Sequence, residues 1–200
     1  MISSTRRALM QVSLACALSP LTAFSQAAST EVAGVTFPAT LKVQQGTLQL
    51  NGAGVRYKAV FKVYAAGLYL TKPVQTTAEA FAQEGPKRVV VQMLREIDSA
   101  ELGRLFSRSM EDNMDKAAFS KVVPGVLRMS EIFSQHKKLA TGDQFTVDWV
   151  PGTGTIITVR GETQGEPFKE PEFFNALLGI WLGPHPADWK LRDALLGKKD

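Results

Sequence analysis

The sequence predicts an α+β fold in which one β-sheet has its helices packed on one side. Three observations support this fold class: strand-like segments come first, helix-like segments lie between them, and a hairpin pattern follows late in the chain. The chain has 200 residues, of which 44% are hydrophobic and 21% charged, and this balance is typical of a globular protein. Because no repeat or long linker divides it, we expect one domain over residues 28–200.

Strands are predicted where apolar and β-branched residues run between turn signals. Phe61–Leu70 has apolar residues at both alternating positions, which is typical of a strand covered on both faces. The glycines of Asn51–Gly54 indicate a turn before this strand. The other predicted strands are Val32–Phe37 and Thr47–Leu50 on either side of Gly46, Lys87–Leu94, and a hairpin formed by Gln144–Val150 and Thr155–Arg160.

Helices are predicted in the segments between and after these strands. Ser99 is a residue type that caps helices, and Glu101 follows in the first turn, so we expect a helix from Ser99 to about Ser120. Pro124-Gly125 is expected to separate it from a second helix that ends near Lys138. The remaining predicted helices are Thr76–Gln83, Phe173–Leu182 and Asp188–Leu196.

The first 27 residues have the pattern of an export signal. Arg6 and Arg7 precede an apolar run, and Ser25-Gln26-Ala27 places small residues at positions −3 and −1 of a cleavage site after Ala27. The run is too short and too polar for a transmembrane anchor. Thr5–Met10 also fits a loose twin-arginine signal, so the export route stays open. We expect a signal peptide over residues 1–27 and a periplasmic protein.

Composition and motifs argue against several classes of function. Without Arg6 and Arg7 the net charge is about +2, from 21 basic and 19 acidic residues, which is too low and too evenly spread to argue for binding to nucleic acid or to an anionic membrane. The single cysteine, Cys16, lies in the predicted signal peptide. His136 and His185 have no partners at ligand spacing, and no dinucleotide, HExxH or GxSxG motif occurs. We therefore expect no metal site and no cofactor, and we assign no catalytic residue.

Two polar residues call for a further explanation. Asn113 interrupts an apolar helical stripe that includes Phe106, and a buried amide needs hydrogen-bond partners. Asn113 therefore either binds a neighbouring backbone or faces a cavity. Arg56 precedes a predicted buried strand, and an arginine that faces a pocket offers a charged planar fork to a carboxylate or phenolate. Lys58 and Lys62 are expected to face solvent.

Three stretches carry a resemblance to a known family: LNGAGVRYKAVFKVYAAGLYL at 50–70, LFSRSMEDN at 105–113 and FNALLGIWLGPHPADWKLRDALLG at 174–197. Together they resemble the chalcone isomerase fold family, and most closely its bacterial chalcone isomerase-like members. The resemblance implies an open-faced β-sandwich, with a large antiparallel sheet, helices on one side and a ligand cleft. In the plant enzymes this cleft closes a 2′-hydroxychalcone to a flavanone without a cofactor.

The family's polar cleft residues are only partly present. The resemblance places Arg56 at the arginine that steadies the phenolate and Asn113 at the asparagine that receives the far ring. Tyr64 and Ile180 stand where the plant enzymes have threonines, and Phe106 stands where they have a tyrosine. Loss of that tyrosine hydroxyl removes a group that organises water at the reacting carbonyl, which predicts poor chalcone conversion.

Lys62–Ala65, KVYA, also resembles the fatty-acid-binding branch of the family, in which an arginine and a tyrosine hold a carboxylate. Phe106 and Ile180 would make the rest of such a cleft apolar. However, Arg56 and Tyr64 are only eight positions apart, which is roughly 26 Å in a straight strand. The pair can share one ligand only if the chain bends between Tyr57 and Phe61.

We expect a binder of a hydrophobic carboxylate such as a fatty acid, a small anionic ligand held by Arg56, Tyr64, Phe106, Asn113 and Ile180. Two alternatives remain: an isomerase of the intramolecular lyase type that acts on an unknown enone or phenol, and a structural or partner-binding protein whose cleft is filled. The sequence names neither a protein partner nor an oligomeric state.

Overall fold

A computed structural model describes residues 29–198. Its strands are β1 (Thr30–Val32), β2 (Val35–Phe37), β3 (Thr40–Val43), β4 (Gly46–Lys58), β5 (Phe61–Leu70), β6 (Lys87–Met93), β7 (Ile97–Asp98), β8 (Lys138–Leu139), β9 (Gln144–Val150), β10 (Gly154–Val159) and β11 (Glu162–Thr163). Its helices are α1 (Thr77–Ala82), α2 (Ser99–Asp112), α3 (Lys116–Ser134), α4 (Pro171–Leu182) and α5 (Trp189–Leu195). The predicted signal peptide over 1–27 lies outside the described residues.

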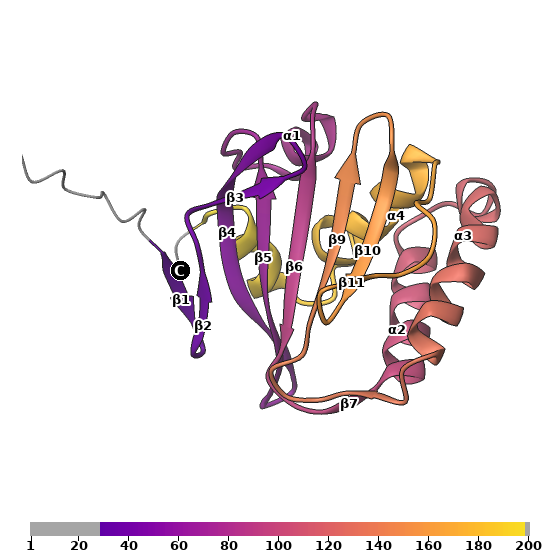
Figure 1. Cartoon of the computed structure of the whole chain (residues 1–200), viewed down its shortest axis with the longest axis horizontal. Helices are drawn as coiled ribbons and strands as arrows, with labels where there is room; N and C mark the ends of the chain where they lie inside the picture. Colours follow the sequence, from indigo (N-terminus) through magenta and orange to yellow (C-terminus); the bar gives the residue numbers. More distant parts are fainter. Residues whose placement is uncertain (1–28, 199–200) are drawn as a thin grey trace, which may run out of the picture.

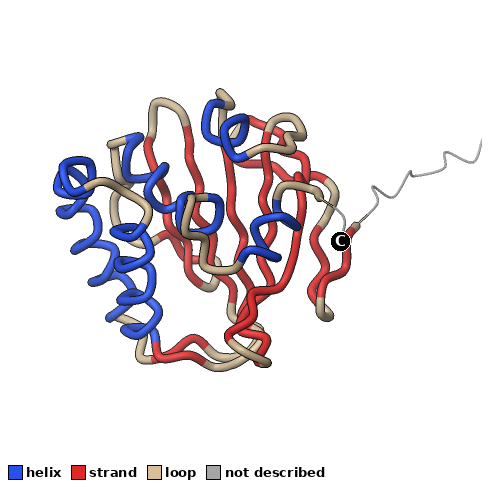
Figure 2. Tube along the Cα trace, turned by 180° about the vertical axis from the view of Figure 1, so that it is seen from behind, coloured by secondary structure: helices blue, strands red, loops and turns tan. Residues whose placement is uncertain are grey.

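Seven strands form one antiparallel sheet in the order β11-β10-β9-β6-β5-β4-β3 (Figure 1). Seen from behind, α4 and α5 cross one face of this sheet and the α2–α3 pair lies beside them (Figure 2). The predicted α+β class, with a large antiparallel sheet and helices on one side, is therefore confirmed.

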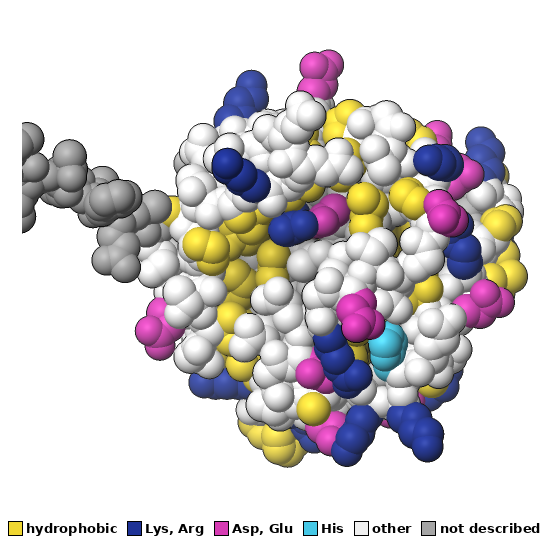
Figure 3. Space-filling view, in the orientation of Figure 1, with side chains coloured by type: hydrophobic (Ala, Val, Ile, Leu, Met, Phe, Trp, Pro, Cys, Tyr) yellow, Lys and Arg dark blue, Asp and Glu magenta, His cyan; other side chains and the backbone are white. Residues whose placement is uncertain are grey.

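Strand β5 is buried on both faces, as its apolar alternation predicts. Val63–Leu70 are all buried. On the helix side, Tyr64, Ala66 and Leu68 belong to the main core with α2, α3, α4 and α5. On the other side, Ala65 and Tyr69 pack with a smaller cluster that includes Phe37 of β2. Apolar side chains are visible on this second face in Figure 3, over the part of the sheet that lies beside the β1–β2 hairpin.

The predicted turn at Asn51–Gly54 is wrong, because β4 continues through it with a register shift between Leu50 and Gly52. The glycines serve a close approach of α5 instead of a turn. A Cβ at Gly54 would lie 2.7 Å from the Cβ of Ala194, and one at Gly52 would collide with backbone oxygens of the same helix. The α5 backbone can therefore lie directly on β4.

The predicted strand Val32–Phe37 is also two strands, because Ala33 and Gly34 both adopt positive φ angles and turn the chain between β1 and β2. The apolar residues of Val32–Phe37 predict one continuous strand, and the sequence analysis did not predict the tight turn at Ala33 and Gly34.

The long helix predicted from Ser99 to Ser120 ends earlier. Asp98 caps α2 by accepting a hydrogen bond from the Glu101 backbone N–H at 2.8 Å, and the helix stops at Asp112. Asp115 then caps α3, which runs through Pro124 instead of starting after it. A Cβ at Gly125 would meet the ring of Phe173 on α4, so close helix packing accompanies this segment. The second helix ends at Ser134, and Lys138 belongs to β8.

Candidate functional site

The β4–β5 hairpin brings Arg56 and Tyr64 side by side. They are direct register partners, and the chain reverses between them at Ala59-Val60. Directly paired residues of an antiparallel ladder point to the same face, and here the Cζ of Arg56 lies 5.7 Å from the centre of the Tyr64 ring. The bend required between Tyr57 and Phe61 is therefore present, as a hairpin.

Tyr64 is a buried hydrogen-bond donor with its proton available. Its side chain is 1% exposed, and its hydroxyl oxygen accepts a hydrogen bond from Nε1 of Trp181 at 2.9 Å. The indole occupies an oxygen lone pair and leaves the hydroxyl hydrogen free to donate. Burial raises the pKa of Tyr64 to about 12, although Arg56 and the Trp181 hydrogen bond act in the opposite direction. Tyr64 is consequently protonated at neutral pH.

Arg56 lies beside a cavity of about 210 Å³ between the hairpin, α2 and the segment after α4. Tyr64, Phe106 and Ile180 line the same cavity. The structure therefore brings together four of the five residues that the sequence indicates. The other lining residues are Leu102, Leu105, Arg108, Ser109, Asp112, His185, Pro186 and Ala187.

Aromatic packing closes the inner end of this cavity. The ring of Phe106 lies edge-on to those of Trp181, Phe133 and Phe145, with centroid distances of 5.5, 5.9 and 5.8 Å. Ile180 is buried beside them. Because these side chains fill the core, an occupant of the cavity cannot extend inward past Phe106 in this arrangement.

Arg56 has no carboxylate partner among residues 29–198. Its side chain also borders a second cavity of about 210 Å³, and Leu105 is the other residue shared by the two cavities. The second cavity is lined by Lys58, Val63, Arg95, Glu96, Ile97, Asp98 and Glu101. Arg56 and Leu105 therefore form the partition between two neighbouring hollows.

Asn113, the fifth indicated residue, does not line either of these cavities. Its side-chain amide donates to the carbonyls of Ser109 at 2.7 Å and His185 at 2.9 Å, and it accepts from the His185 N–H at 2.8 Å. Asn113 is half-buried and binds neighbouring backbone groups, as the first alternative predicts, and it also lines a separate cavity between α1 and α4. Because His185 lines the Arg56 cavity, Asn113 positions its wall.

The sequence analysis did not indicate Trp181, and it assigned no role to His185. Trp181 is separated from Tyr64 by 117 positions, and no local pattern marks the two as partners. Arg108 and Asp112 follow Leu105 at helical spacing and therefore lie on the same face of α2. This spacing is the signal that could have indicated them as cavity-lining residues.

Among residues 29–198, no three His, Cys, Asp or Glu side chains are grouped in a way that could hold a metal ion. Within the same range, no helix combines the length and the apolar character needed to cross a membrane.

Comparison with known proteins gives one family and one fold. Residues 29–197 match the family described as chalcone isomerase-like. A solved structure of a fatty-acid binding protein from Arabidopsis thaliana is similar, with a TM-score of 0.64 and 17% identity, over 82% of this chain and 92% of that one. The comparison with curated proteins gave no match.

Proposed function

Because the chain belongs to the chalcone isomerase-like family, we propose that its Arg56 cavity binds the carboxylate of a hydrophobic acid such as a fatty acid. The similar Arabidopsis thaliana protein is a fatty-acid binding protein by its title, which supports a binding role. At 17% identity that likeness concerns the fold, so the ligand has to be argued from the residues of this chain. Export through residues 1–27 is part of the same proposal.

The observation that carries the proposal is the pairing of Arg56 with Tyr64. Arg56 supplies a permanent cation without a carboxylate partner among residues 29–198, and Tyr64 supplies a neutral O–H whose hydrogen is free. A carboxylate has two oxygens that accept hydrogen bonds, so one group can receive both donors. The register of β4 and β5 holds the donors on one face before any ligand arrives.

The size of the cavity limits how the rest of the ligand is held. A volume of about 210 Å³ is below the roughly 300 Å³ at which pockets for drug-sized ligands begin. It suits a carboxylate and the first carbons of a chain. Since the aromatic cluster around Phe106 blocks the inward route, we expect a longer tail to leave the cavity past Leu105 toward solvent.

Proton chemistry favours binding over catalysis. With a pKa of about 12, Tyr64 holds its proton at neutral pH and is a poor general base. Phe106 and Ile180 contribute no polar atom toward a reacting carbonyl. Arg56 and Tyr64 can therefore orient an anion, and the cavity offers apolar contact around them.

The test is calorimetric titration of C8 to C18 acids and their methyl esters into the wild type and three variants. A charge-assisted hydrogen bond contributes on the order of 1.5–3 kcal/mol, so Arg56→Ala should weaken acid binding by roughly ten- to a hundredfold. Arg56→Lys should recover part of this loss, because lysine cannot present a planar fork. Arg104→Ala is the matched control, since Arg104 is an exposed cation on α2 that lines neither cavity.

Methyl esters should bind more weakly than acids to the wild type and about equally to Arg56→Ala. If esters bind the wild type as well as acids do, or if Arg56→Ala weakens binding no more than Arg104→Ala, then Arg56 is not an anion anchor and the proposal is wrong.

A further inference from the structure

Exposed apolar side chains gather at the end of the β4–β5 hairpin. Among residues 29–198, five large apolar residues are exposed, and three of them are in this hairpin: Tyr57 at 41%, Val60 at 83% and Phe61 at 58%. Trp189, at 55%, lines one surface groove together with Tyr57 and Ala59. Figure 3 shows apolar side chains at the lower edge of the molecule, where β4 and β5 end in Figure 1.

The turn itself departs from ordinary hairpin chemistry. Two-residue hairpin turns favour Asn, Asp and Gly, which are polar or tolerate positive φ. Here the turn is Ala59-Val60, with Ala59 at a φ of 54° and the β-branched Val60 pointing into solvent. Val60 leaves 83% of its surface exposed at this turn, and departures of this kind are expected at functional positions.

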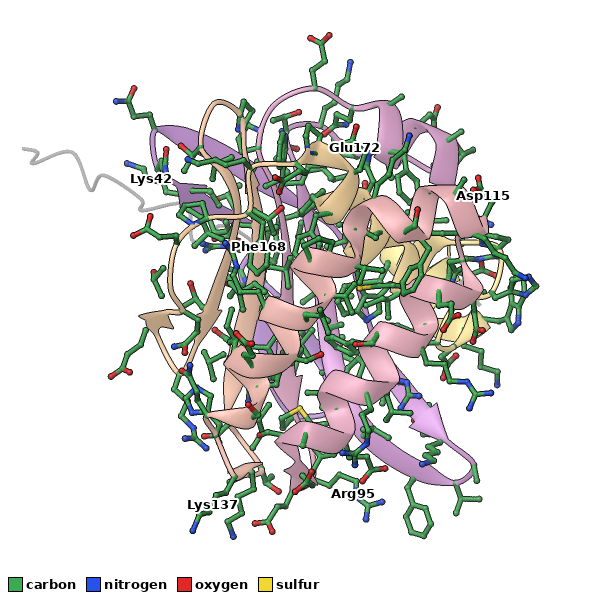
Figure 4. The ribbon with its side chains drawn as sticks, turned by 90° about the vertical axis from the view of Figure 1, so that its right-hand side faces the viewer. Lys42, Arg95, Asp115, Lys137, Phe168 and Glu172 are labelled. Carbon is green, nitrogen blue, oxygen red and sulfur yellow. The ribbon has the colours of Figure 1, made fainter. Side chains whose placement is uncertain are left out.

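Cations surround these apolar residues. Lys58 and Lys62 belong to the hairpin, and the guanidinium of Arg95 lies 5.1 Å above the Phe61 ring. Lys58 is 3.9 Å from Glu101, but both side chains are exposed, so their attraction is weak. Figure 4 places Arg95 and Lys137 at the end of the molecule from which the hairpin projects. The segments that meet there, 57–62, 94–101 and 136–139, carry five cations and three carboxylates, a net charge of +2.

We propose that this hairpin end, defined by Tyr57, Lys58, Val60, Phe61 and Lys62, docks on the surface of an anionic phospholipid bilayer. Val60 and Phe61 would enter the headgroup region, and tyrosine is suited to the same zone because it combines an apolar ring with a polar tip. The lysines would contact lipid phosphates.

The shape and charge of the hairpin end favour a bilayer over a second copy of the chain. The apolar residues project at the apex of a narrow hairpin, whereas a protein interface requires a broad complementary surface. Two copies meeting through this end would also bring two positively charged surfaces together. The proposal does not depend on carboxylate binding in the Arg56 cavity.

The test is co-sedimentation of residues 28–200, the chain after the predicted cleavage site, with vesicles of neutral phosphatidylcholine and with vesicles containing 30% phosphatidylglycerol, at low and high salt. We expect binding to anionic vesicles that weakens as salt rises. Lys58→Gln/Lys62→Gln should lower the partition coefficient about 25-fold, since each cation near such a surface contributes about fivefold. Val60→Asn/Phe61→Ser should lower it at least tenfold, and Asn suits a turn, so the fold is retained.

Matched controls lie on α3, where Leu127 is an exposed apolar residue and Lys116 and Lys121 are exposed cations. Leu127→Ser and Lys116→Gln/Lys121→Gln should stay within twofold of the wild type. Every variant lacks residues 1–27, because the apolar run after Arg6 and Arg7 would itself bind vesicles, so the comparison isolates the hairpin. As a second readout, the emission of Phe61→Trp should shift to the blue on anionic vesicles.

Three results would each overturn the proposal. The hairpin variants could lose no more binding than the control variants, the wild type could bind neutral vesicles in a way that salt does not change, or it could bind no vesicles at all. Concentration-dependent dimerisation that Val60→Asn/Phe61→Ser abolishes would instead identify a second copy as the partner and equally refute it.

Discussion

Removing the hydroxyl of Tyr64 should destabilise the protein through Trp181. In Tyr64→Phe the Nε1–H of Trp181 loses its acceptor, and Trp181 is itself 1% exposed. A buried donor left without a partner costs about 1–3 kcal/mol. For a domain of this size that corresponds to a fall in Tm of roughly 2–12 °C.

Tyr69→Phe provides the matched control, because it removes the same atom from a second buried tyrosine of β5. The Tyr69 hydroxyl donates to the carbonyl of Pro38 at 3.1 Å in a partly buried position. Water can reach that carbonyl after the substitution, so we expect a smaller loss of about 0.5–1.5 kcal/mol.

Urea unfolding followed by far-ultraviolet circular dichroism measures both variants, with the m-value used to check that the two-state transition is unchanged. Trp181→Phe and the double variant Tyr64→Phe/Trp181→Phe complete a cycle, in which we expect a coupling of about 0.5–3 kcal/mol. If Tyr64→Phe is no less stable than Tyr69→Phe, or if the cycle gives no coupling, the Tyr64–Trp181 hydrogen bond does not have the energetic role assigned to it.

Two further predictions concern the wall of the cavity and its chemistry. Asn113→Ala removes the three hydrogen bonds to Ser109 and His185. It should lower the free energy of unfolding by about 1–3 kcal/mol, measured by urea unfolding. A loss below about 0.5 kcal/mol would contradict the positioning role of Asn113. The protein should not convert 2′-hydroxychalcone in a spectrophotometric assay, because Tyr64 is protonated and Phe106 offers no hydroxyl. Rapid turnover abolished by Arg56→Ala would show that the site is catalytic.

Much of the fold could be predicted because its signals are local. The apolar residues at both alternations of Phe61–Leu70 required a strand covered on two faces, and β5 is such a strand. The glycines near Gly54 were misinterpreted, since their reason is the approach of Ala194, 140 positions later. Pro124 was misinterpreted as a helix boundary, although α3 continues through it against α4.

Part of the candidate site could likewise be predicted from the sequence, and part could not. The resemblance indicated Arg56, Tyr64, Phe106 and Ile180, and all four line one cavity. It also indicated Asn113, whose amide is committed to backbone groups of α2 and of the segment after α4. An asparagine in an apolar stripe gives the same sequence pattern in both situations, so only its partners could distinguish them.

By itself the sequence determined most of the strands and helices of the main sheet and its covering layer, which faces are apolar, and which side chains can hold an anion. These properties depend on neighbours along the chain and on the chemistry of single residues. The tertiary structure decided that Arg56 lies against Tyr64, that Trp181 leaves the Tyr64 proton free, and that aromatic rings close the cavity at about 210 Å³. Burial, pairing and cavity volume arise from contacts between distant segments, such as the 117 positions from Tyr64 to Trp181, and a local pattern does not encode them.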